Sequence, residues 1–403
     1  MDSEVLFRLF PENLRNSLSR YNIELDMPSA PHRSWVEVSR AQIAGNYRAV
    51  RQLVGPHVAV MPVVKADAYR HGAVEVSRVL VSEGADGLAV SNVEEGVILR
   101  QSGITQPILV MADFLPSERP ELVHYSLTPV IHSLDDIAAW NRLAESHGKP
   151  LPYHLKIDSG MGRLGVWDSP TKIAAAIAAS KAAHLEGLMT HFASSADYSS
   201  EQTDQQAANF HALAQQLAET GIKPRFTHLS STIPIAYQRT AAWGNLVRPG
   251  HAIYGYVSPT RGEHAPASSL DVHPALTWKA AVLAVKTLPA GTPIGYGAMY
   301  RAPREMRIAV LAAGYADGIP HRLGNRGYVI AQGKLAPIIG AVSMDLTTID
   351  ATDCLGLSVG DSVMLLGQDG EMSIDAQQMA RTAGTISYSV LCGISARVRR
   401  VYV

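Results

Sequence analysis

Residues 58–72, VAVMPVVKADAYRHG, contain the pattern that decides the fold: an apolar, β-branched run, then a lysine, then a segment with helical spacing. The same alternation recurs along the chain. Apolar runs that predict strands occur at 58–64, 87–90, 107–111, 127–131, 152–157, 185–191, 225–229 and 245–248. Longer segments that predict helices separate them, as in NVEEGVILRQSG (92–103) and EQTDQQAANFHALAQQLAETG (201–221). This pattern predicts an α/β fold, with a parallel (β/α)8 barrel of the TIM type over residues 34–270.

An open, doubly wound sheet is the alternative for this part of the chain. Such a sheet usually has fewer strands, and no GxGxxG motif follows the first strand candidate. The barrel is therefore the expected architecture.

The sequence changes character after about residue 270. Runs such as LTWKAAVLAVKTL (276–288), MRIAVLAAGY (306–315) and PIIGAVS (337–343) alternate with Gly, Pro and Asp turns. They predict a mainly antiparallel β domain over residues 271–403, with one helix near SIDAQQMARTAG (373–384). Residues 1–33 are polar and interrupted by proline, and we expect them to form an N-terminal extension.

Composition excludes several classes of protein. Lys plus Arg number 35 and Asp plus Glu 36, so the net charge of -1 offers no basic excess for nucleic acid. Two cysteines, Cys354 and Cys392, cannot form a disulfide framework or a four-thiolate zinc site, and we expect no metal. The chain has no apolar run of membrane-spanning length, and MDSEVLFRLFPENLRNSLSR lacks the apolar core of a secretory signal. We expect a cytoplasmic, globular protein.

Lys65 stands at the end of the first strand candidate. In a parallel barrel the carboxyl ends of the strands form the active-site face. A partly desolvated lysine there has a lowered pKa and can form a Schiff base. The alternative is a lysine whose charged end reaches past the strand into solvent. Tyr69, four residues further on, either turns its hydroxyl towards the same face or packs in the core.

The segment KIDSGMGRLG (156–165) places charged residues at the end of the fifth strand candidate. Arg163 offers a planar fork suited to a carboxylate or a phosphate, although a salt-bridged loop arginine is the alternative. Lys156 would point into the barrel and need an anionic partner, because lone buried charges are costly.

Two histidines, His191 and His228, end two further strand candidates. A zinc site would need a third ligand, and none occurs at suitable spacing. Hydrogen-bonded scaffold histidines are the favoured interpretation.

Short polar segments close the seventh and eighth strand candidates, where barrels often bind phosphate. Ser231 and the amide of Gly250 fit that role. In the second domain GYADG (314–318) carries Tyr315, AVSMD (341–345) carries Met344, and YSVLCGIS (388–395) begins with Tyr388. Composition alone assigns these three residues no role.

Eight of these segments, in their order along the chain, resemble the motifs of the alanine racemase family, whose members use pyridoxal phosphate. The segments are VVKADAYRHG, KIDSGMGRLG, MTHFA, HLSST, VRPGHAIYGY, GYADG, AVSMD and YSVLCGIS. The resemblance covers residues 34–403. It implies a homodimer with shared active sites that interconverts L- and D-alanine, a small amino-acid substrate, and supplies D-alanine for cell-wall synthesis.

The resemblance also implies a role for each site residue. Lys65 would carry pyridoxal 5'-phosphate and act as the base on the D face, and Tyr315 of the other subunit would act on the L face. Arg163 and the Met344 backbone would bind the substrate carboxylate. The cofactor phosphate would be held by Tyr69, Ser231, Gly250, His251 and Tyr388. Arg248 would lie against the pyridine nitrogen of the cofactor, with His191 supporting it. Lys156 matches a position that is carbamylated in many members.

The chain departs from the family pattern at four positions. Arg70 replaces a glycine, Asp67 and Ser230 replace asparagines, and His251 replaces an aliphatic residue. The first three bear on how the cofactor loop is positioned, and the contact expected of His251 runs through its backbone.

Three other functions remain open. The first is a racemase of serine or another small amino acid on the same scaffold. The second is a barrel-type amino-acid decarboxylase, which needs an active-site cysteine and acidic residues, and neither Cys354 nor Cys392 makes a case for it. The third is a pyridoxal-phosphate carrier or homeostasis protein, which would resemble the barrel alone and would not explain the second domain with Tyr315.

Overall fold

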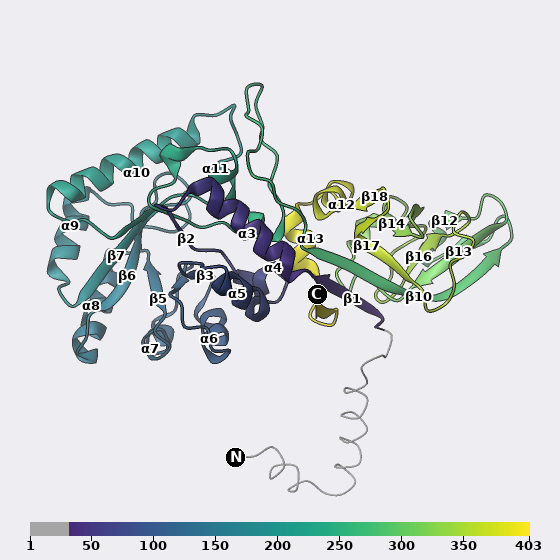
Figure 1. Ribbon diagram of the computed structural model, residues 1–403, viewed down its shortest axis with the longest axis horizontal. Helices are drawn as coiled ribbons and strands as arrows, with labels where there is room; N and C mark the ends of the chain where they lie inside the picture. The colour runs from purple at the N-terminus through teal and green to yellow at the C-terminus, as the bar shows by residue number, and fades with distance from the viewer. Residues whose placement is uncertain (1–31) are drawn as a thin grey trace, which may run out of the picture.

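The computed structural model describes residues 32–403, so nearly all of the N-terminal extension expected over residues 1–33 lies outside the described residues. Figure 1 shows two parts side by side. Residues 40–254 form a ring of strands with helices packed around it, and residues 276–403 together with residues 34–38 form a part rich in sheet.

Eight parallel strands form the ring, and each corresponds to one of the predicted apolar runs. The strands are β2 (Ala59–Val60), β3 (Leu88–Val90), β4 (Ile108–Val110), β5 (Thr128–Ile131), β6 (Leu151–Lys156), β7 (Ala183–Met189), β8 (Phe226–His228) and β9 (Leu246–Val247). Strands β3 to β8 pair in chain order, and β2 pairs with β9.

Backbone hydrogen bonds join these two groups of strands into a closed barrel. Between β2 and β3, the Val64 N–H donates to the Ala89 carbonyl at 2.8 Å. Between β8 and β9, the Arg248 N–H donates to the Ser230 carbonyl at 3.0 Å. The predicted (β/α)8 barrel is confirmed, and closure leaves it with no free sheet edge.

Helices follow most of the strands, and the longer ones cover the outside of the barrel. They are α4 (Lys65–Tyr69), α5 (Ala73–Ser82), α6 (Val93–Gln101), α7 (Arg119–His124), α8 (Leu134–His147), α9 (Pro170–Ala179), α10 (Gln202–Glu219) and α11 (Thr232–Ala236), with 3-10 turns η1 (Pro116–Glu118), η2 (Thr240–Ala242) and η3 (His251–Tyr254). Side chains cap several of them: Asn92 accepts from the Glu95 N–H at 2.9 Å, and Ser133 accepts from the Asp136 N–H at 3.1 Å.

Helix α3 (Arg40–Val54), which precedes the first barrel strand, packs against the turn η3 that follows the last one. The buried amide of Asn46 fixes this contact, because it donates to the carbonyls of Ile253 at 3.0 Å and His273 at 2.9 Å. Helix α3, which comes before the barrel strands in the chain, therefore covers the junction between β9 and β2, where a helix after β9 would otherwise lie.

The second part is built on a nine-stranded sheet, in which the strand order β15-β14-β17-β10-β1-β19 is extended by β13, β16 and β18. Its strands are β1 (Ser34–Val38), β10 (Leu276–Leu288), β13 (Met306–Leu311), β14 (Tyr328–Ala331), β15 (Lys334–Pro337), β16 (Thr347–Asp350), β17 (Ser362–Asp369), β18 (Met372–Ile374) and β19 (Arg399–Tyr402). The hairpin strands β11 (Pro293–Ile294) and β12 (Tyr300–Arg301), the turns η4 (Tyr296–Ala298) and η5 (His321–Leu323), and the helices α12 (Ala376–Ala383) and α13 (Ser387–Gly393) complete it. Apart from the parallel pair β1–β19, the pairings in this sheet are antiparallel, as predicted.

Three features of this part differ from the sequence-based expectation. Strand β1 comes from the start of the described chain yet pairs with β10 and β19, so the sheet of the second part begins before the barrel does. The strand predicted at 337–343 is wrong, because β15 ends at Pro337 and the ladder continues only as an isolated Ile338–Ile349 bridge. A second helix, α13, follows α12 where one helix was expected.

Candidate active site

A cavity of about 670 Å³ lies at the carboxyl ends of the barrel strands, with α13 of the second part as one wall. This is the face on which barrel enzymes place their chemistry. The predicted site residues that line it are Lys65, Tyr69, Lys156, Arg163, His191, Ser231, Arg248, Gly250, His251 and Tyr388. Residues spread over more than three hundred positions of sequence therefore meet in one space.

The charge of this cavity is one-sided. Four lining residues carry cationic side chains, namely Lys65, Lys156, Arg163 and Arg248, whereas the described residues that line the cavity include no Asp or Glu. A cavity of this kind favours anionic groups such as a phosphate or a carboxylate.

Lys65 begins α4, a turn with unusual backbone geometry. Residues 66–70 all have positive φ angles, between 52° and 66°, although none of them is glycine. A left-handed turn of L-residues is costly, and such strain persists where the surroundings determine it. The Glu95 carboxylate is one such determinant, since it accepts from the Ala66 N–H at 2.7 Å and the Ser91 N–H at 2.8 Å. Burial and the neighbouring Arg163 cation lower the pKa of Lys65, which favours the neutral amine that a nucleophile or base requires.

Two departures from the family pattern lie in this turn and make contacts of their own. Asp67 accepts from the Ala73 N–H at 2.7 Å and so caps α5. Arg70 adopts a φ of 66°, a conformation natural to the glycine it replaces, and its Nε–H reaches the Cys392 carbonyl at 3.4 Å. The Arg400 Nε–H in turn donates to the Arg70 carbonyl at 3.1 Å, which ties the turn to the second part.

Arg163 is carried by a loop that folds around one carboxylate. Asp158 accepts hydrogen bonds from four consecutive backbone N–H groups, those of residues 160–163, at 3.0, 2.7, 2.8 and 3.2 Å. Burial alone would raise the pKa of Asp158, but these donors outweigh it and keep the pKa below its ordinary value. The loop can therefore present the Arg163 guanidinium, whose side chain lines the cavity, from an ordered backbone.

Lys156 is 5% exposed and ends β6 on the inside of the barrel. The described part of the chain provides no hydrogen bond or ion pair to its ammonium group within contact distance. Burial, followed by the nearby Arg163 and Arg248 cations, lowers the pKa of Lys156 to about 8. Lys156 is therefore a buried amine whose pKa lies close to neutral pH. The anionic partner that the sequence predicts for it is not found among the described residues.

Arg248, only 2% exposed, is fixed by its two terminal nitrogens. Nη1 donates to the ring Nδ1 of His228 at 2.7 Å and to the His228 carbonyl at 3.0 Å, and Nη2 donates to the carbonyls of Thr190 at 2.9 Å and Leu229 at 3.2 Å. Among the described residues the Nε–H has no acceptor, so this donor remains for a ligand. Burial lowers the pKa of Arg248 to about 9, which leaves it protonated at neutral pH.

The contact with His228 starts a chain of hydrogen bonds through the barrel core. Arginine can only donate, so His228 must accept at Nδ1 and carry its proton on Nε2. That Nε2 lies 2.7 Å from Nδ1 of His154, which must also accept, so His154 carries its proton on Nε2 towards the Glu186 carboxylate at 3.5 Å. Burial lowers the pKa of both histidines, in agreement with neutral rings. The chain runs from the cation Arg248 to the anion Glu186 through two imidazoles of fixed tautomer.

Part of the cavity wall carries hydroxyl groups and a close backbone approach. Gly250 is needed here, since a Cβ atom at this position would lie 2.6 Å from the Tyr69 hydroxyl. The Tyr69 and Tyr388 rings lie 5.9 Å apart, and Ser231 lines the same cavity. Burial raises the pKa of both tyrosines, so their hydroxyl groups are hydrogen-bond donors rather than bases.

The remaining two departures pack in or beside this wall. Ser230 donates to the Ala242 carbonyl at 2.7 Å and is fully buried. The His251 ring stacks on Tyr388, with centroids 3.9 Å apart, and on Tyr256 at 5.0 Å. Burial lowers the pKa of His251 to about 3, so the ring is neutral. His191, on the cation-rich side, is also neutral, because burial and then Arg248 lower its pKa to about 3.

Tyr315 and Met344 are not among the residues that line this cavity. They lie together on the second part, exposed by 45% and 54%, at two adjoining turns. The Tyr315 N–H donates to the Ser343 carbonyl at 2.9 Å, whereas the Met344 N–H has no acceptor among the described residues.

Sequence reasoning assigned no site role to several lining residues, among them Cys392 and Thr232. Cys392 contributes to the cavity wall from α13, and burial raises the pKa of its thiol. The Thr232 hydroxyl accepts from the Gly250 N–H at 3.2 Å and from the Ala252 N–H at 3.1 Å, which fixes the backbone after β9. Thr232 lies in HLSST and Cys392 in YSVLCGIS, two of the segments that resemble family motifs. Their positions in these motifs, rather than their residue types, could have identified them.

Within residues 32–403 no cluster of three or more His, Cys, Asp or Glu side chains could hold a metal ion. The same residues contain no helix long and apolar enough to cross a membrane.

Two family models match the chain, one to each part. The model of the alanine racemase N-terminal domain matches residues 38–259, and that of the alanine racemase C-terminal domain matches residues 275–402. An alanine racemase of Halothermothrix orenii is 38% identical over 370 residues, which is 92% of this chain and 96% of that one.

Solved structures give the same result. The alanine racemase of Bacillus anthracis with bound L-Ala-P is 31% identical and superposes with a TM-score of 0.85, covering 94% of this chain and 96% of that one. The alanine racemase of Bartonella henselae with covalently bound pyridoxal phosphate is 27% identical, with a TM-score of 0.81 and coverage of 93% and 100%.

Proposed function

Because the chain belongs to the alanine racemase family, we propose that it interconverts L- and D-alanine with pyridoxal 5'-phosphate, using Lys65 and Tyr315 as bases on opposite faces of the substrate. The observation that carries the proposal is the barrel cavity with four cations and no carboxylate among its described lining residues. In the cell it would work in the cytoplasm as a homodimer and supply D-alanine for cell-wall synthesis.

The residues present fit this cofactor. A phosphate would be held by the donors on the hydroxyl-rich wall, namely Tyr69, Ser231, Tyr388 and the backbone at Gly250 and His251. A Cβ atom at Gly250 would lie only 2.6 Å from the Tyr69 hydroxyl, so the absence of a side chain lets the backbone and this hydroxyl approach the same place. Lys65 lies within the same cavity, where its amine would bond to the cofactor aldehyde. When bound, the cofactor would withdraw electrons from the substrate Cα and so acidify its C–H bond.

Lys65 would be the base on the D face. A lysine at its ordinary pKa is protonated at neutral pH and cannot accept a proton. Burial and Arg163 lower the pKa of Lys65, so a larger fraction of its side chain is neutral and ready to take the Cα proton.

Tyr315 would be the base on the L face, contributed by a second copy of the chain. The tyrosines of the cavity itself are unsuited to this role, because burial raises the pKa of Tyr69 and Tyr388. Tyr315 is exposed and beside Met344, so both could enter a neighbour's cavity together. Racemisation needs opposed bases, and two subunits supply them from opposite sides.

Arg163 would bind the substrate carboxylate with its planar guanidinium, and the free N–H of Met344 would donate to the same carboxylate from the partner. Lys156 supports this arrangement if its amine takes up CO₂. The pKa of Lys156 is about 8, so its amine is neutral at higher pH. The neutral amine reacts with CO₂ to form a carbamate and releases one proton, which replaces a buried cation by an anion beside Arg163.

Arg248 would donate its remaining Nε–H to the ring nitrogen of the cofactor. Because a guanidinium keeps its proton, Arg248 leaves that nitrogen unprotonated, which disfavours side reactions that need a stronger electron sink. His191, neutral beside it, adds no competing positive charge.

The residues that line the cavity do not fit the decarboxylase alternative. A decarboxylase of basic amino acids needs acidic side chains, and the described lining residues include none. Cys392 does lie in the wall, but burial raises the pKa of its thiol and keeps it protonated.

The test is a racemisation assay on purified protein loaded with pyridoxal phosphate, over L-alanine, L-serine and other small amino acids. We expect alanine to react fastest, and borohydride to fix the pyridoxyl group on the peptide that contains Lys65. Preference for serine would change the substrate assignment. A label on another lysine, or no racemisation of any amino acid, would overturn the proposal.

A further inference from the structure

The two turns that carry Tyr315 and Met344 are held against each other by their backbones. The Tyr315 N–H donates to the Ser343 carbonyl and the Ala316 N–H to the Met344 carbonyl, both at 2.9 Å. The approach is so close that a Cβ atom at Gly314 would lie 2.3 Å from the Ser343 carbonyl oxygen. The Tyr315 side chain is nevertheless nearly half exposed, with an edge-on contact to His321 at a centroid distance of 6.2 Å, so within one chain its position depends strongly on the backbone that carries it.

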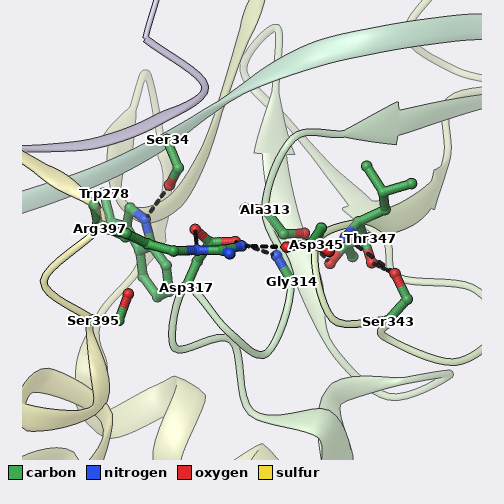
Figure 2. Close-up of polar contacts among 12 residues, drawn as sticks. Ser34, Trp278, Ala313, Gly314, Asp317, Ser343, Asp345, Thr347, Ser395 and Arg397 are labelled. Carbon is green, nitrogen blue, oxygen red and sulfur yellow. Dashed lines mark hydrogen bonds and ion pairs between the residues drawn. The ribbon is translucent and has the colours of Figure 1, made fainter. Parts of the chain in front are cut away.

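An ion-pair network beneath these turns connects them, and Figure 2 shows it. Asp317 is 5% exposed, and its carboxylate accepts from the Gly314 N–H at 2.8 Å. Arg397 donates to both oxygens of Asp317, from Nε at 2.7 Å and from Nη2 at 2.8 Å. The same Nη2 donates to Asp345, the residue after Met344, at 2.8 Å. One guanidinium therefore joins the turn of Tyr315 to the turn of Met344.

The geometry of this network is specific to arginine. A planar fork can contact both oxygens of one carboxylate and reach a second carboxylate, whereas a lysine ammonium is a point charge. The hydrogen bonds to Asp317 and Asp345 raise the pKa of Arg397 above its ordinary value, so the pair stays charged. Loss of the fork would leave the buried Asp317 carboxylate incompletely compensated, two residues after Tyr315 in the same turn.

We propose that Arg397 is a positioning residue for the neighbour's active site, because it sets where Tyr315 and the Met344 N–H stand. This inference rests on the proposed function, in which both groups serve the partner's cavity. A general base works only within hydrogen-bond reach of its proton, and a displacement of about 1 Å can cost roughly 10²-fold in rate. Arg397 would touch neither substrate nor cofactor.

The first test is Arg397→Lys, which keeps the charge and removes the fork. We expect kcat to fall about 10–100-fold, since the misplaced group acts in the proton transfer. Arg399→Lys is the matched control, because Arg399 is an exposed arginine two residues along, and it should behave as wild type. Hydrogen exchange in the loaded dimer should accelerate in residues 313–318, where the Gly314 N–H depends on Asp317. Wild-type kcat together with unchanged exchange would overturn the inference.

The decisive test uses hybrid dimers, separated by two affinity tags, that pair an Arg397→Lys subunit with an inactive Lys65→Ala subunit. One site of the hybrid then takes Lys65 from the first chain and an intact Tyr315 turn from the second. We expect that site to regain the turnover of a wild-type site. If Arg397 instead acts on its own cavity, through α13 of the same chain, the hybrid stays as slow as the Arg397→Lys parent and the inference is wrong.

A parallel hybrid of Tyr315→Phe with Lys65→Ala separates this failure from failure of the proposed function. Recovery in this control and none with Arg397→Lys would overturn the positioning role alone. If the control also fails to recover while the subunits are shown to be paired, Tyr315 does not serve the neighbour's site, and both the shared-site proposal and this inference are wrong.

Discussion

The substitution Asp158→Asn tests how the Arg163 loop is built. The carboxylate accepts four backbone N–H groups, at 3.0, 2.7, 2.8 and 3.2 Å, and holds the loop in one conformation. An amide of the same shape offers one oxygen, so two contacts survive and the amide NH₂ faces the other two donors. A hydrogen bond to a charged group contributes about 1.5–3 kcal/mol, and we take about 1 kcal/mol for each lost contact because water can replace it at this half-buried site.

The two lost contacts amount to about 2 kcal/mol, or roughly a 30-fold smaller equilibrium constant for the binding conformation of the loop. The apparent affinity for the substrate carboxylate follows the fraction of loops in that conformation, so it falls by up to this factor. Saturating substrate restores the loop, so KM for alanine should rise by up to about 30-fold while kcat changes much less.

Steady-state racemisation in both directions measures this split. Asp168→Asn is the control and should leave KM unchanged, since among residues 32–403 the exposed Asp168 carboxylate has a hydrogen bond with Lys172 alone, at 3.2 Å. The contribution of Asp158 has a defined pH range. Its pKa is depressed, so its stabilisation is complete above about pH 4 and is lost only as the pH falls through the lowered value. A wild-type KM for Asp158→Asn, or a loss confined to kcat, would refute this account of the loop.

Three further substitutions test separate parts of the cavity. In CO₂-free buffer, Lys156→Met should raise the Tm of the cofactor-free protein at pH 7. This gain should shrink as the pH rises from 8 to 10.5, because the wild-type lysine is then neutral in the folded state but still charged in the unfolded state. A pH-independent difference in Tm would contradict the lowered pKa. Gly250→Ala should weaken cofactor binding roughly 5–150-fold in a fluorescence titration, because overpacking against the Tyr69 hydroxyl costs about 1–3 kcal/mol. The control Gly393→Ala, whose added Cβ atom would have no neighbour within 4 Å, should bind the cofactor normally. Nitrogen-15 NMR of labelled histidines should find His228 protonated on Nε2, in the wild type and in His154→Phe alike, because Arg248 still donates to its Nδ1. A proton on Nδ1 of the wild-type ring would refute the chain from Arg248 to Glu186.

The barrel and its active-site face follow from local sequence patterns. Each apolar run ends at a residue that the parallel strand order carries to the same face, which is why Lys65, Lys156 and Arg248 could be grouped before their geometry was known. The place of Tyr388 in the same cavity needed the family resemblance, because nothing in its local sequence marks it. Tyr69 and Ser231 were candidates from their positions after strand ends.

Other features depend on contacts that no local pattern encodes. The left-handed turn at residues 66–70 contains no glycine, so its backbone is imposed by partners such as Glu95. Strand β1 finds its place beside β10, more than 240 positions away. The Arg397–Asp317 pair spans 80 positions. Long-range pairing of this kind is set by the completed fold rather than by propensity.

The central claim, that Lys65 and Tyr315 act on opposite faces of alanine in one shared site, is tested most directly by hydrogen exchange at Cα. Wild-type enzyme and Tyr315→Phe are incubated with D- or L-alanine in D₂O, and deuterium incorporation is followed in each enantiomer. Loss of one general base should cost about 10²–10⁴ in rate. We predict that Tyr315→Phe loses exchange from L-alanine by that factor and retains far more of the exchange from D-alanine, because Lys65 can still remove and return that proton. Equal loss from both enantiomers would contradict the assignment of Tyr315 to one face.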